Sequence, residues 1–376
     1  MKGTQKSNSV LEDMEPSKAI IKLAIPATLA LLAKAVYNLV DTAYIGMLHS
    51  DIALTAVGVT VPLLLIMVSI ENIFAAGAAV LAGRQLGAKD EEGASRTVTT
   101  VIGLSVMIGI LLCVGGIVFI DPLMRAFGAS DTSLQLAKDY AFWMFVAALA
   151  NLPAQSMNWN FIKTIALIGI PTAVIQICLS VAASLTNIAA SALPQSDEII
   201  AAYGVVQRLI LIGCYVIMGF MQGYQPVASY AFGARNEDRF HQSVRFALKG
   251  SMLLTVLVAA VYIILAKPLI CLFNGNPVIV NYGRWLLISQ VIIYPAFGLC
   301  YMMTITYQTI GASRYGLFLS AIRQGLFYIP FILILPKLLG IRGIYFSQPA
   351  ADILTILVCV LSIKSMKKIA SKNMGT

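Results

Sequence analysis

Residues 52–81 have the sequence IALTAVGVTVPLLLIMVSIENIFAAGAAVL, in which the only charged side chain is Glu71. A helix needs about 20 consecutive apolar residues to cross the hydrocarbon core of a bilayer, so this stretch is typical of a transmembrane helix. The whole chain shares this character, since 59% of its 376 residues are hydrophobic and only 11% are charged. A soluble domain has about a quarter of its residues charged. The sequence therefore predicts an integral membrane protein.

Nine further apolar runs accompany this one. The ten runs lie at residues 19–47, 52–81, 98–120, 140–153, 164–193, 199–231, 246–266, 282–310, 315–335 and 344–363. We expect an all-α integral membrane protein of about ten transmembrane helices. Because ten is an even number, both termini are expected on the same side of the membrane.

The net charge of +9 is concentrated in short segments between the runs. Arg84, Lys89 and Arg96 follow the second run, and Arg235 and Arg239 follow the sixth. Cytoplasmic loops of membrane proteins are rich in Lys and Arg, so both termini are predicted to be cytoplasmic. The basic residues form no aromatic-interleaved face of the kind that binds nucleic acid, and we expect no nucleic-acid partner.

Cysteine and histidine usage gives no indication of a metal site. The six cysteines lie within or at the edge of apolar runs without a CxxC pair, and the chain has two histidines. We therefore expect no metal, no disulfide framework and no organic cofactor. No catalytic motif of a membrane enzyme is present, so the sequence does not predict an enzyme. Residues 1–18 are polar and are interpreted as a cytoplasmic tail instead of a signal peptide.

An internal repeat organises the chain. Pro26 and Pro171 open two similar segments, and the turn Gly87-Ala88-Lys89 returns as Gly233-Ala234-Arg235 at almost the same offset. Two similar membrane segments in one chain are typical of secondary transporters. The repeat predicts an N-terminal bundle at 19–161 and a C-terminal bundle at 162–364, followed by a cytoplasmic tail at 365–376.

The two copies differ in length. The second copy continues past Pro295 as far as Ser365, whereas the first ends soon after Pro153, where Pro171 already opens the next copy. The first bundle is therefore predicted to have four helices and the second six. A helical hairpin is expected to be missing between Asn158 and Lys163.

Several motifs carry a family resemblance. They are Tyr37-Asn38-Leu39-Val40-Asp41 with Ile45-Gly46, Gly83-Arg84-Gln85-Leu86-Gly87-Ala88, Ala202-Tyr203-Gly204 with Arg208, Gly223-Tyr224-Gln225-Pro226, Tyr230-Ala231-Phe232-Gly233-Ala234, Arg323-Gln324, and Pro349-Ala350-Ala351-Asp352. With these motifs the chain resembles the multidrug and toxic compound extrusion (MATE) family, in its MepA-like bacterial branch. The part expected to be missing corresponds to family helices five and six.

The resemblance implies a fold and a function. The fold would be two repeated helical bundles around a central cleft, in the bacterial plasma membrane. The function would be secondary active multidrug efflux, in which H⁺ or Na⁺ is exchanged for a cationic or amphipathic drug. In this branch the fifth helix usually supplies a second acidic residue, so half of the first bundle's cation site would be absent. Membrane lipid, and self-association that covers the shortened bundle, are the other partners expected.

Asp41 is the leading candidate for cation coupling. A charged side chain in hydrocarbon is costly and usually faces a cavity. A carboxylate withdrawn from water also takes up a proton more easily. Asn38 precedes it by about one helical turn and is a candidate co-ligand. The alternative is that Asp41 is paired with Lys34 two turns earlier, which would argue against coupling.

The remaining candidates are polar or helix-bending residues. Glu71 either extends toward the cytoplasm or lines the cleft, and Arg208 is interpreted as structural. Gln176, Gln207 and Gln225 either line the cleft or hydrogen-bond between helices. Three prolines are candidates for helix bends or gates: Pro26, Pro171 and Pro295. The alternative is that each is an ordinary membrane-helix proline.

Two other functions stay open from the sequence. The chain could be a truncated remnant that inserts but does not transport. It could also move a lipid-linked saccharide, which a row of cationic side chains along the cleft would favour. No such row is visible in the sequence.

Overall fold

The computed structural model describes residues 10–47, 51–126, 134–147, 159–273 and 276–375, and every secondary-structure element in this part of the chain is a helix. The elements are α2 (Pro16–Met47), α3 (Asp51–Gly87), α4 (Glu91–Val118), α5 (Ile120–Ala126), α6 (Leu134–Ala147), α7 (Trp159–Ser191), α8 (Ser196–Gly233), α9 (Glu237–Ile264), α10 (Ala266–Cys271), α11 (Pro277–Val291), α12 (Pro295–Thr309), α13 (Ser313–Ala321), the π-helical segment η2 (Ile322–Tyr328), α14 (Ile329–Leu339) and α15 (Ile341–Met374). The predicted all-α membrane fold is confirmed.

Within the described residues, seven helical stretches are long and apolar enough to cross a membrane, and an eighth is obtained if α11 and α12 are counted as one bent span. Each of the ten apolar runs lies mainly in one helix or in consecutive helices. The described part of α6, however, has 14 residues, fewer than the roughly 20 that a straight span needs. The count of ten transmembrane helices is therefore not established.

The sequence repeat corresponds to repeated local geometry. α4 and α9 each have 28 residues, and they begin at equivalent positions of the two copies, Glu91 and Glu237. Lys89 and Arg235, which precede them, both adopt a left-handed backbone conformation. Asp90 and Asn236 then cap the helices, because the side-chain Oδ1 of each accepts a hydrogen bond from the backbone N–H three residues later, at 2.8 and 2.9 Å. Two copies of one turn therefore start the equivalent helices.

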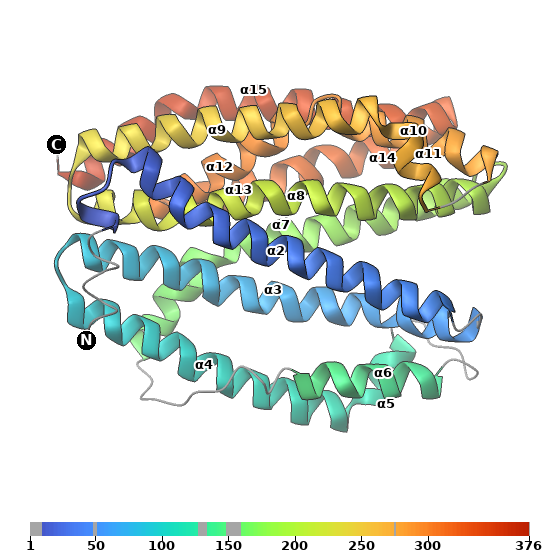
Figure 1. Cartoon of the computed structure of the whole chain (residues 1–376), viewed down its shortest axis with the longest axis horizontal. Coiled ribbons are helices and arrows are strands. Elements are labelled where there is room, and N and C mark those ends of the chain that lie inside the picture. The colour runs from blue at the N-terminus through green and yellow to red at the C-terminus, as the bar shows by residue number, and fades with distance from the viewer. Residues whose placement is uncertain (1–9, 48–50, 127–133, 148–158, 274–275, 376) are drawn as a thin grey trace.

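The helices form two groups on either side of a central layer (Figure 1). α4 and α6 pack with α3, and α5 packs with α6, whereas α9, α11 and α12 pack with α8, and α13 and α14 pack with α7. α2 packs mainly along α8 and contacts α3 only slightly, and α3 packs along α7 and α8. Helices of the first copy thus lie directly against helices of the second.

Both ends of the described chain lie at the same end of the molecule, on the left in Figure 1. Arg239, at the start of α9, donates hydrogen bonds to the backbone carbonyls of Leu11 and Met14. Asn373, near the end of α15, donates to the carbonyl of Ile310 at 2.8 Å. The terminal segments are therefore fixed against helix ends, and we call this the terminal end of the molecule.

Glycines allow the two copies to approach closely at the terminal end. A Cβ on Gly87 of α3 would collide with the carbonyl oxygen of Tyr230, and one on Gly233 of α8 would collide with the carbonyl oxygen of Arg84. α2 and α8 approach in the same way, since a Cβ on Gly223 would lie 2.5 Å from the backbone nitrogen of Ala24. Small residues permit such close backbone contact between membrane helices.

Arg84 adds a polar link at the same end. Its Nε donates to the carbonyl oxygen of Thr309 at 2.8 Å, and a terminal nitrogen donates to the carbonyl of Gln308. The guanidinium also lies 5.5 Å from the centre of the Phe232 ring. These carbonyls end α12, where a positive charge complements the helix dipole. The first copy is thereby joined to the second.

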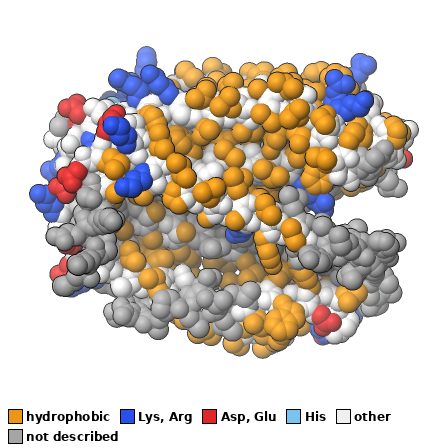
Figure 2. All heavy atoms as spheres, viewed as in Figure 1, with side chains coloured by type: hydrophobic (Ala, Val, Ile, Leu, Met, Phe, Trp, Pro, Cys, Tyr) orange, Lys and Arg blue, Asp and Glu red, His pale blue; other side chains and the backbone are white. Residues whose placement is uncertain are grey.

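The surface agrees with a membrane environment. Figure 2 shows hydrophobic side chains over the middle of the visible face, with Lys, Arg, Asp and Glu side chains mainly toward its two ends. The same face is hollowed between its upper and lower halves at the end opposite the termini. An apolar belt between two charged ends is the arrangement that a bilayer requires.

Candidate functional site

A cavity of about 350 Å³ lies between the two copies. Its lining comes from α2, α3, α7, α8, α11, α12, η2 and α15. Cavities of about 300–1,000 Å³ with a mostly apolar lining are typical small-molecule sites. Aliphatic side chains that line it include Leu31, Ile175, Leu179, Ile210, Leu211 and Met218.

Aromatic rings form one wall of this cavity. Phe297 stacks on Tyr294 on one side and on Tyr301 on the other, with ring centres 5.6 and 5.7 Å apart. Tyr203 and Tyr328 also line the cavity. The 45° bend between α11 and α12 places Tyr294 at the corner and starts the row of rings. The wall offers flat apolar surfaces with hydroxyl groups at intervals.

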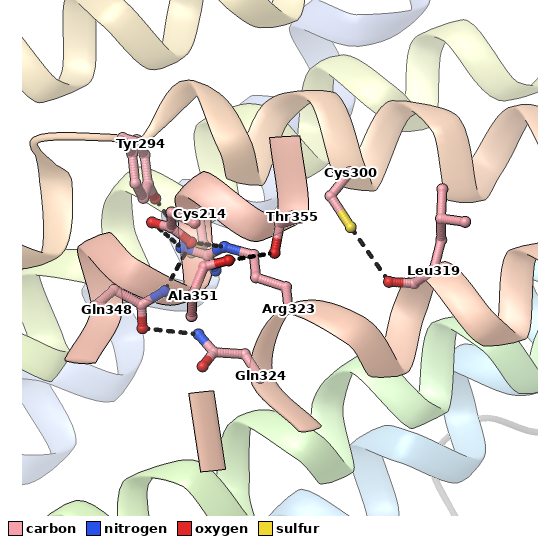
Figure 3. A network of polar contacts seen from close by, with 10 residues as sticks. Cys214, Tyr294, Cys300, Leu319, Arg323, Gln324, Gln348, Ala351 and Thr355 are labelled. Atoms are coloured by element: carbon pink, nitrogen blue, oxygen red, sulfur yellow. Dashed lines mark hydrogen bonds and ion pairs between the residues drawn. The ribbon is translucent and has the colours of Figure 1, made fainter. Parts of the chain in front are cut away.

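A buried ion pair lies next to this wall, within the polar network of Figure 3. Arg323 Nε donates to Asp352 Oδ1 at 2.8 Å, and a terminal nitrogen reaches Oδ2 at 3.3 Å. Gln348 donates a further hydrogen bond to Oδ1 at 2.9 Å. The Asp352 side chain is 1% exposed and that of Arg323 10%. The Arg323 guanidinium lies 5.3 Å from the Phe297 ring centre, so the pair and the aromatic row form one unit.

The π-helical segment η2 places Arg323 at the cavity. η2 interrupts the helix between α13 and α14, and Arg323, Gln324 and Tyr328 all line the cavity from it. π-helical turns are rare and occur frequently at functional sites. Gln324 donates to Gln348 Oε1 at 3.4 Å, while its own buried Oε1 has no hydrogen-bond partner among the described residues.

Two more basic side chains line the cavity. Lys34 of α2 and Arg208 of α8 are both exposed to it. Neither has a hydrogen-bond or ion-pair partner among the residues that the structure describes. With Arg323, the structure thus brings three cationic side chains from three helices to one cavity, although no such group was visible in the sequence.

The predicted polar residues separate into two sets. Gln176 and Gln207 line the cavity, and Gln207 donates a hydrogen bond to the hydroxyl of Tyr203. Gln225 is buried and does not line it; its side chain instead donates to the carbonyl of Ala76 at 3.4 Å and links α8 to α3. Arg208, interpreted from sequence as structural, faces the cavity.

The predicted coupling residues cannot be placed in this site. The side chains of Asp41, Asn38 and Glu71 lie outside the described part of the structure. Asn72, the neighbour of Glu71 on α3, does line the cavity.

The three candidate bend prolines have different surroundings. α2 and α7 run through Pro26 and Pro171 as continuous helices. Pro295, in contrast, starts α12 directly after the bend from α11. Whether any of the three acts as a gate stays a prediction.

The buried ion pair was not predicted as part of the site. Arg323 and Asp352 were recognised only as parts of motifs, although both are charged residues inside the apolar runs 315–335 and 344–363. A charged residue at membrane depth is by itself a reason to expect a function or a partner. That signal could have identified both residues but not their pairing, since they lie on different helices.

Comparison with known proteins gives the family. The MatE family model matches the chain in two segments, residues 26–161 and 171–334, which begin at Pro26 and Pro171. The chain belongs to the MatE family. The MatE assignment confirms the resemblance predicted from the motifs.

Curated relatives match along nearly their whole length. Multidrug export protein MepA of Staphylococcus haemolyticus is 20% identical over 433 residues, with 95% of this chain and 95% of the relative covered. MepA of Staphylococcus aureus (strain NCTC 8325 / PS 47) is 20% identical over 423 residues, with 92% and 93% covered. Both are export proteins by name, in agreement with the prediction that the chain is not an enzyme.

Solved structures show the same fold. The crystal structure of MATE in complex with MaL6 has a TM-score of 0.88 and 19% identity, with 96% of this chain and 99% of the other covered. A MOP superfamily transporter from Pyrococcus furiosus also has a TM-score of 0.88 and 19% identity, with 98% and 99% covered. At this identity the likeness establishes the fold alone.

Proposed function

We propose that this MatE protein is a secondary active exporter of cationic or amphipathic drugs, driven by antiport of H⁺ or Na⁺. The observation that carries the proposal is the cavity of about 350 Å³, which is lined from both copies of the repeat. Substrate sites of secondary transporters lie near the bilayer midplane, where repeats meet. Relatives at 20% identity bear the name multidrug export protein, which favours the same class of cargo. No cofactor takes part besides the coupling ion.

Alternating access is proposed between bundles at residues 19–161 and 162–364. The two segments matched by the family model support this division, as do the equal lengths and equivalent starts of α4 and α9. At the terminal end the copies are held by the Gly87–Gly233 crossing and by Arg84. The hollow in Figure 2 lies at the other end. Separation of the terminal-end contacts would expose the cavity to the opposite side of the membrane.

The proposed location is the bacterial plasma membrane with both termini cytoplasmic. The terminal end includes the turns that carry Lys89 and Arg235 and the start of α9 with Arg239. An excess of Lys and Arg marks the cytoplasmic side. In this orientation the contacts at Gly87, Gly233 and Arg84 would lie on the cytoplasmic side.

Cation coupling is proposed at Asp41, with Asn38 as co-ligand. Asp41 follows the cavity-lining Lys34 on α2 by about two helical turns. Protonation or Na⁺ binding at this carboxylate would change the charge carried by α2. The bends at Pro26, Pro171 and Pro295 are proposed as the positions where helices move.

We also propose that the first bundle lacks one helical hairpin. The comparison with the S. haemolyticus relative spans 433 residues, whereas this chain has 376 residues in all, so many aligned positions have no residue of this chain opposite them. Two spanning helices of about 20 residues each, with their loops, would fill such a gap. Self-association would cover the surface that the hairpin would otherwise cover.

Transport by cells tests this proposal. The chain would be produced in a pump-deficient bacterium, with insertion verified, and efflux of ethidium and fluorescein would be followed after energising the cells. Efflux of either dye that is lost in an Asp41→Asn variant supports an ion-coupled exporter. Absence of efflux for both dyes from inserted protein would favour a non-transporting remnant. The three cationic side chains of the cavity, Lys34, Arg208 and Arg323, are the feature expected of the lipid-linked saccharide alternative. That alternative is favoured if the inserted protein moves neither dye but flips a lipid-linked saccharide in reconstituted vesicles.

A further inference from the structure

The charge of the cavity points to a narrower class of cargo. Among the described lining residues, the charged side chains are Lys34, Arg208 and Arg323, and all three are cationic. Asp352 neutralises Arg323 through the paired hydrogen bonds at 2.8 and 3.3 Å. Lys34 and Arg208 remain without a hydrogen-bond or ion-pair partner in the described part of the chain. The cavity therefore presents two cations that no described side chain neutralises.

Both cations lie well inside long apolar helices. Lys34 stands near the middle of α2 (Pro16–Met47), and Arg208 stands about a third of the way along α8 (Ser196–Gly233). At a rise of 1.5 Å per residue, each is about 18–20 Å from the nearer helix end. A cationic side chain at such depth is costly and is retained where it faces a polar cavity or a counter-charge.

The packing of α2 against α8 brings the two cations to neighbouring levels. A Cβ on Gly219 would meet Thr28, and one on Gly223 would meet Ala24, so the helices run antiparallel with these positions opposite one another. Extending that register places Lys34 opposite Gly213. Arg208 is five residues farther along α8, a separation of about 7.5 Å along the axis. Both side chains thus line the cavity from neighbouring levels.

The rest of the cavity suits an apolar body. The stacked rings of Tyr294, Phe297 and Tyr301 offer flat surfaces. Aliphatic side chains such as Leu179 and Met218 complete the lining. Methionine adapts to ligands of different shapes. We propose that the cavity takes an amphipathic organic anion, with its carboxylate or sulfonate between Lys34 and Arg208 and its apolar body against the aromatic wall.

This inference rests on the proposed function only in taking the cavity as the cargo site. It departs from the expectation of a cationic drug. A free cation in the cavity would meet Lys34 and Arg208 in a medium of low dielectric constant, where like charges repel strongly. A carboxylate would instead accept charge-assisted hydrogen bonds from both side chains.

Equilibrium binding tests the inference separately from transport. The full chain would be placed in nanodiscs of phosphatidylcholine, and binding of fluorescein and tetramethylrosamine would be followed by fluorescence polarisation. These dyes share a xanthene ring system and carry opposite charges. We expect fluorescein to bind at least about tenfold more tightly. Lys34→Gln and Arg208→Gln should each weaken fluorescein binding about tenfold, as expected for loss of one hydrogen bond to a charged group.

A matched control separates cavity charge from net charge. Lys267→Gln removes the same kind of charge from an exposed position on α10 that does not line the cavity, and it should leave fluorescein binding unchanged. Addition of phosphatidylglycerol to the nanodiscs distinguishes a soluble anion from an anionic lipid, since only a lipid occupant would displace fluorescein. Equal binding of the two dyes, or tighter binding of tetramethylrosamine, would overturn the inference. Unchanged fluorescein binding in both cavity variants would overturn it as well.

The binding and efflux experiments together distinguish the anion site from transport. A protein that exports ethidium but binds no fluorescein would be an exporter with a cationic cargo. A protein that binds fluorescein selectively but moves neither dye would have the anion site without transport.

Discussion

The ion pair of Arg323 and Asp352 should make a large contribution to the stability of the fold. An Arg323→Gln variant would leave the Asp352 carboxylate, which is 1% exposed, with Gln348 as its remaining described partner. Removal of one partner from a buried pair typically costs about 3–5 kcal/mol. An Asp352→Asn variant should lose a similar amount, because the guanidinium is then unpaired.

The double variant tests the physical reason. When both partners of a buried ion pair are replaced by uncharged residues of similar volume, the free energy of unfolding often changes little. We therefore expect Arg323→Gln with Asp352→Asn to lose about 2 kcal/mol or less, well below the sum of the single losses. The Arg323→Gln protein should also regain stability as the pH falls, because a protonated Asp352 no longer carries a charge.

Thermal unfolding in detergent measures the effect. At about 2.1 cal/mol/K of unfolding entropy per residue, a loss of about 3–5 kcal/mol lowers the Tm of a 376-residue chain by about 4–6 °C. Asp121→Asn is a suitable control, since it breaks a surface pair with Lys138 in which the Asp121 side chain is 57% exposed, and such pairs contribute about 0–1 kcal/mol. If the double variant instead loses as much stability as the two single variants together, the two side chains do not act as an ion pair and this account is refuted.

Three further predictions concern the terminal end and coupling. Gly87→Ala should lower the Tm strongly, because its Cβ would collide with the carbonyl of Tyr230, whereas Gly204→Ala, which has open space around it, should leave the Tm unchanged or slightly raised; equal effects would contradict the crossing. Arg84→Gln should increase hydrogen exchange in the peptide that ends α12, because Thr309 and Gln308 lose their donor; unchanged exchange would show that Arg84 does not hold that end. Asp41→Asn should abolish dye efflux with normal insertion, and retention of efflux would remove Asp41 from the coupling site.

The sequence predicted the helical repeat because its signals are local. The apolar runs define the helices, and each Gly-Ala-Lys or Gly-Ala-Arg turn lies just before a helix start. Asp90 and Asn236 cap those helices one residue later. Such features depend on a few consecutive residues, so the constant offset between the copies could be found without a structure.

The cavity could not be predicted in the same way. Lys34, Arg208 and Arg323 are far apart in sequence, and the helices that carry them meet only through tertiary packing. Periodicity does not show which face of an apolar helix meets the cavity, since these helices are apolar on nearly every side. The π-helical turn at Ile322–Tyr328 further rotates the face that carries Arg323. Three charges that looked isolated in sequence thus form one site.

Transport by the purified chain tests the central claim most directly. The protein would be reconstituted in proteoliposomes, and uptake or release of fluorescein and ethidium would be followed after a proton or sodium gradient is imposed. The account predicts dye movement against its own gradient that stops when the ion gradient is collapsed and that is lost in Asp41→Asn. Dye movement that is absent, or that is indifferent to both ion gradients, would contradict a cation-coupled exporter.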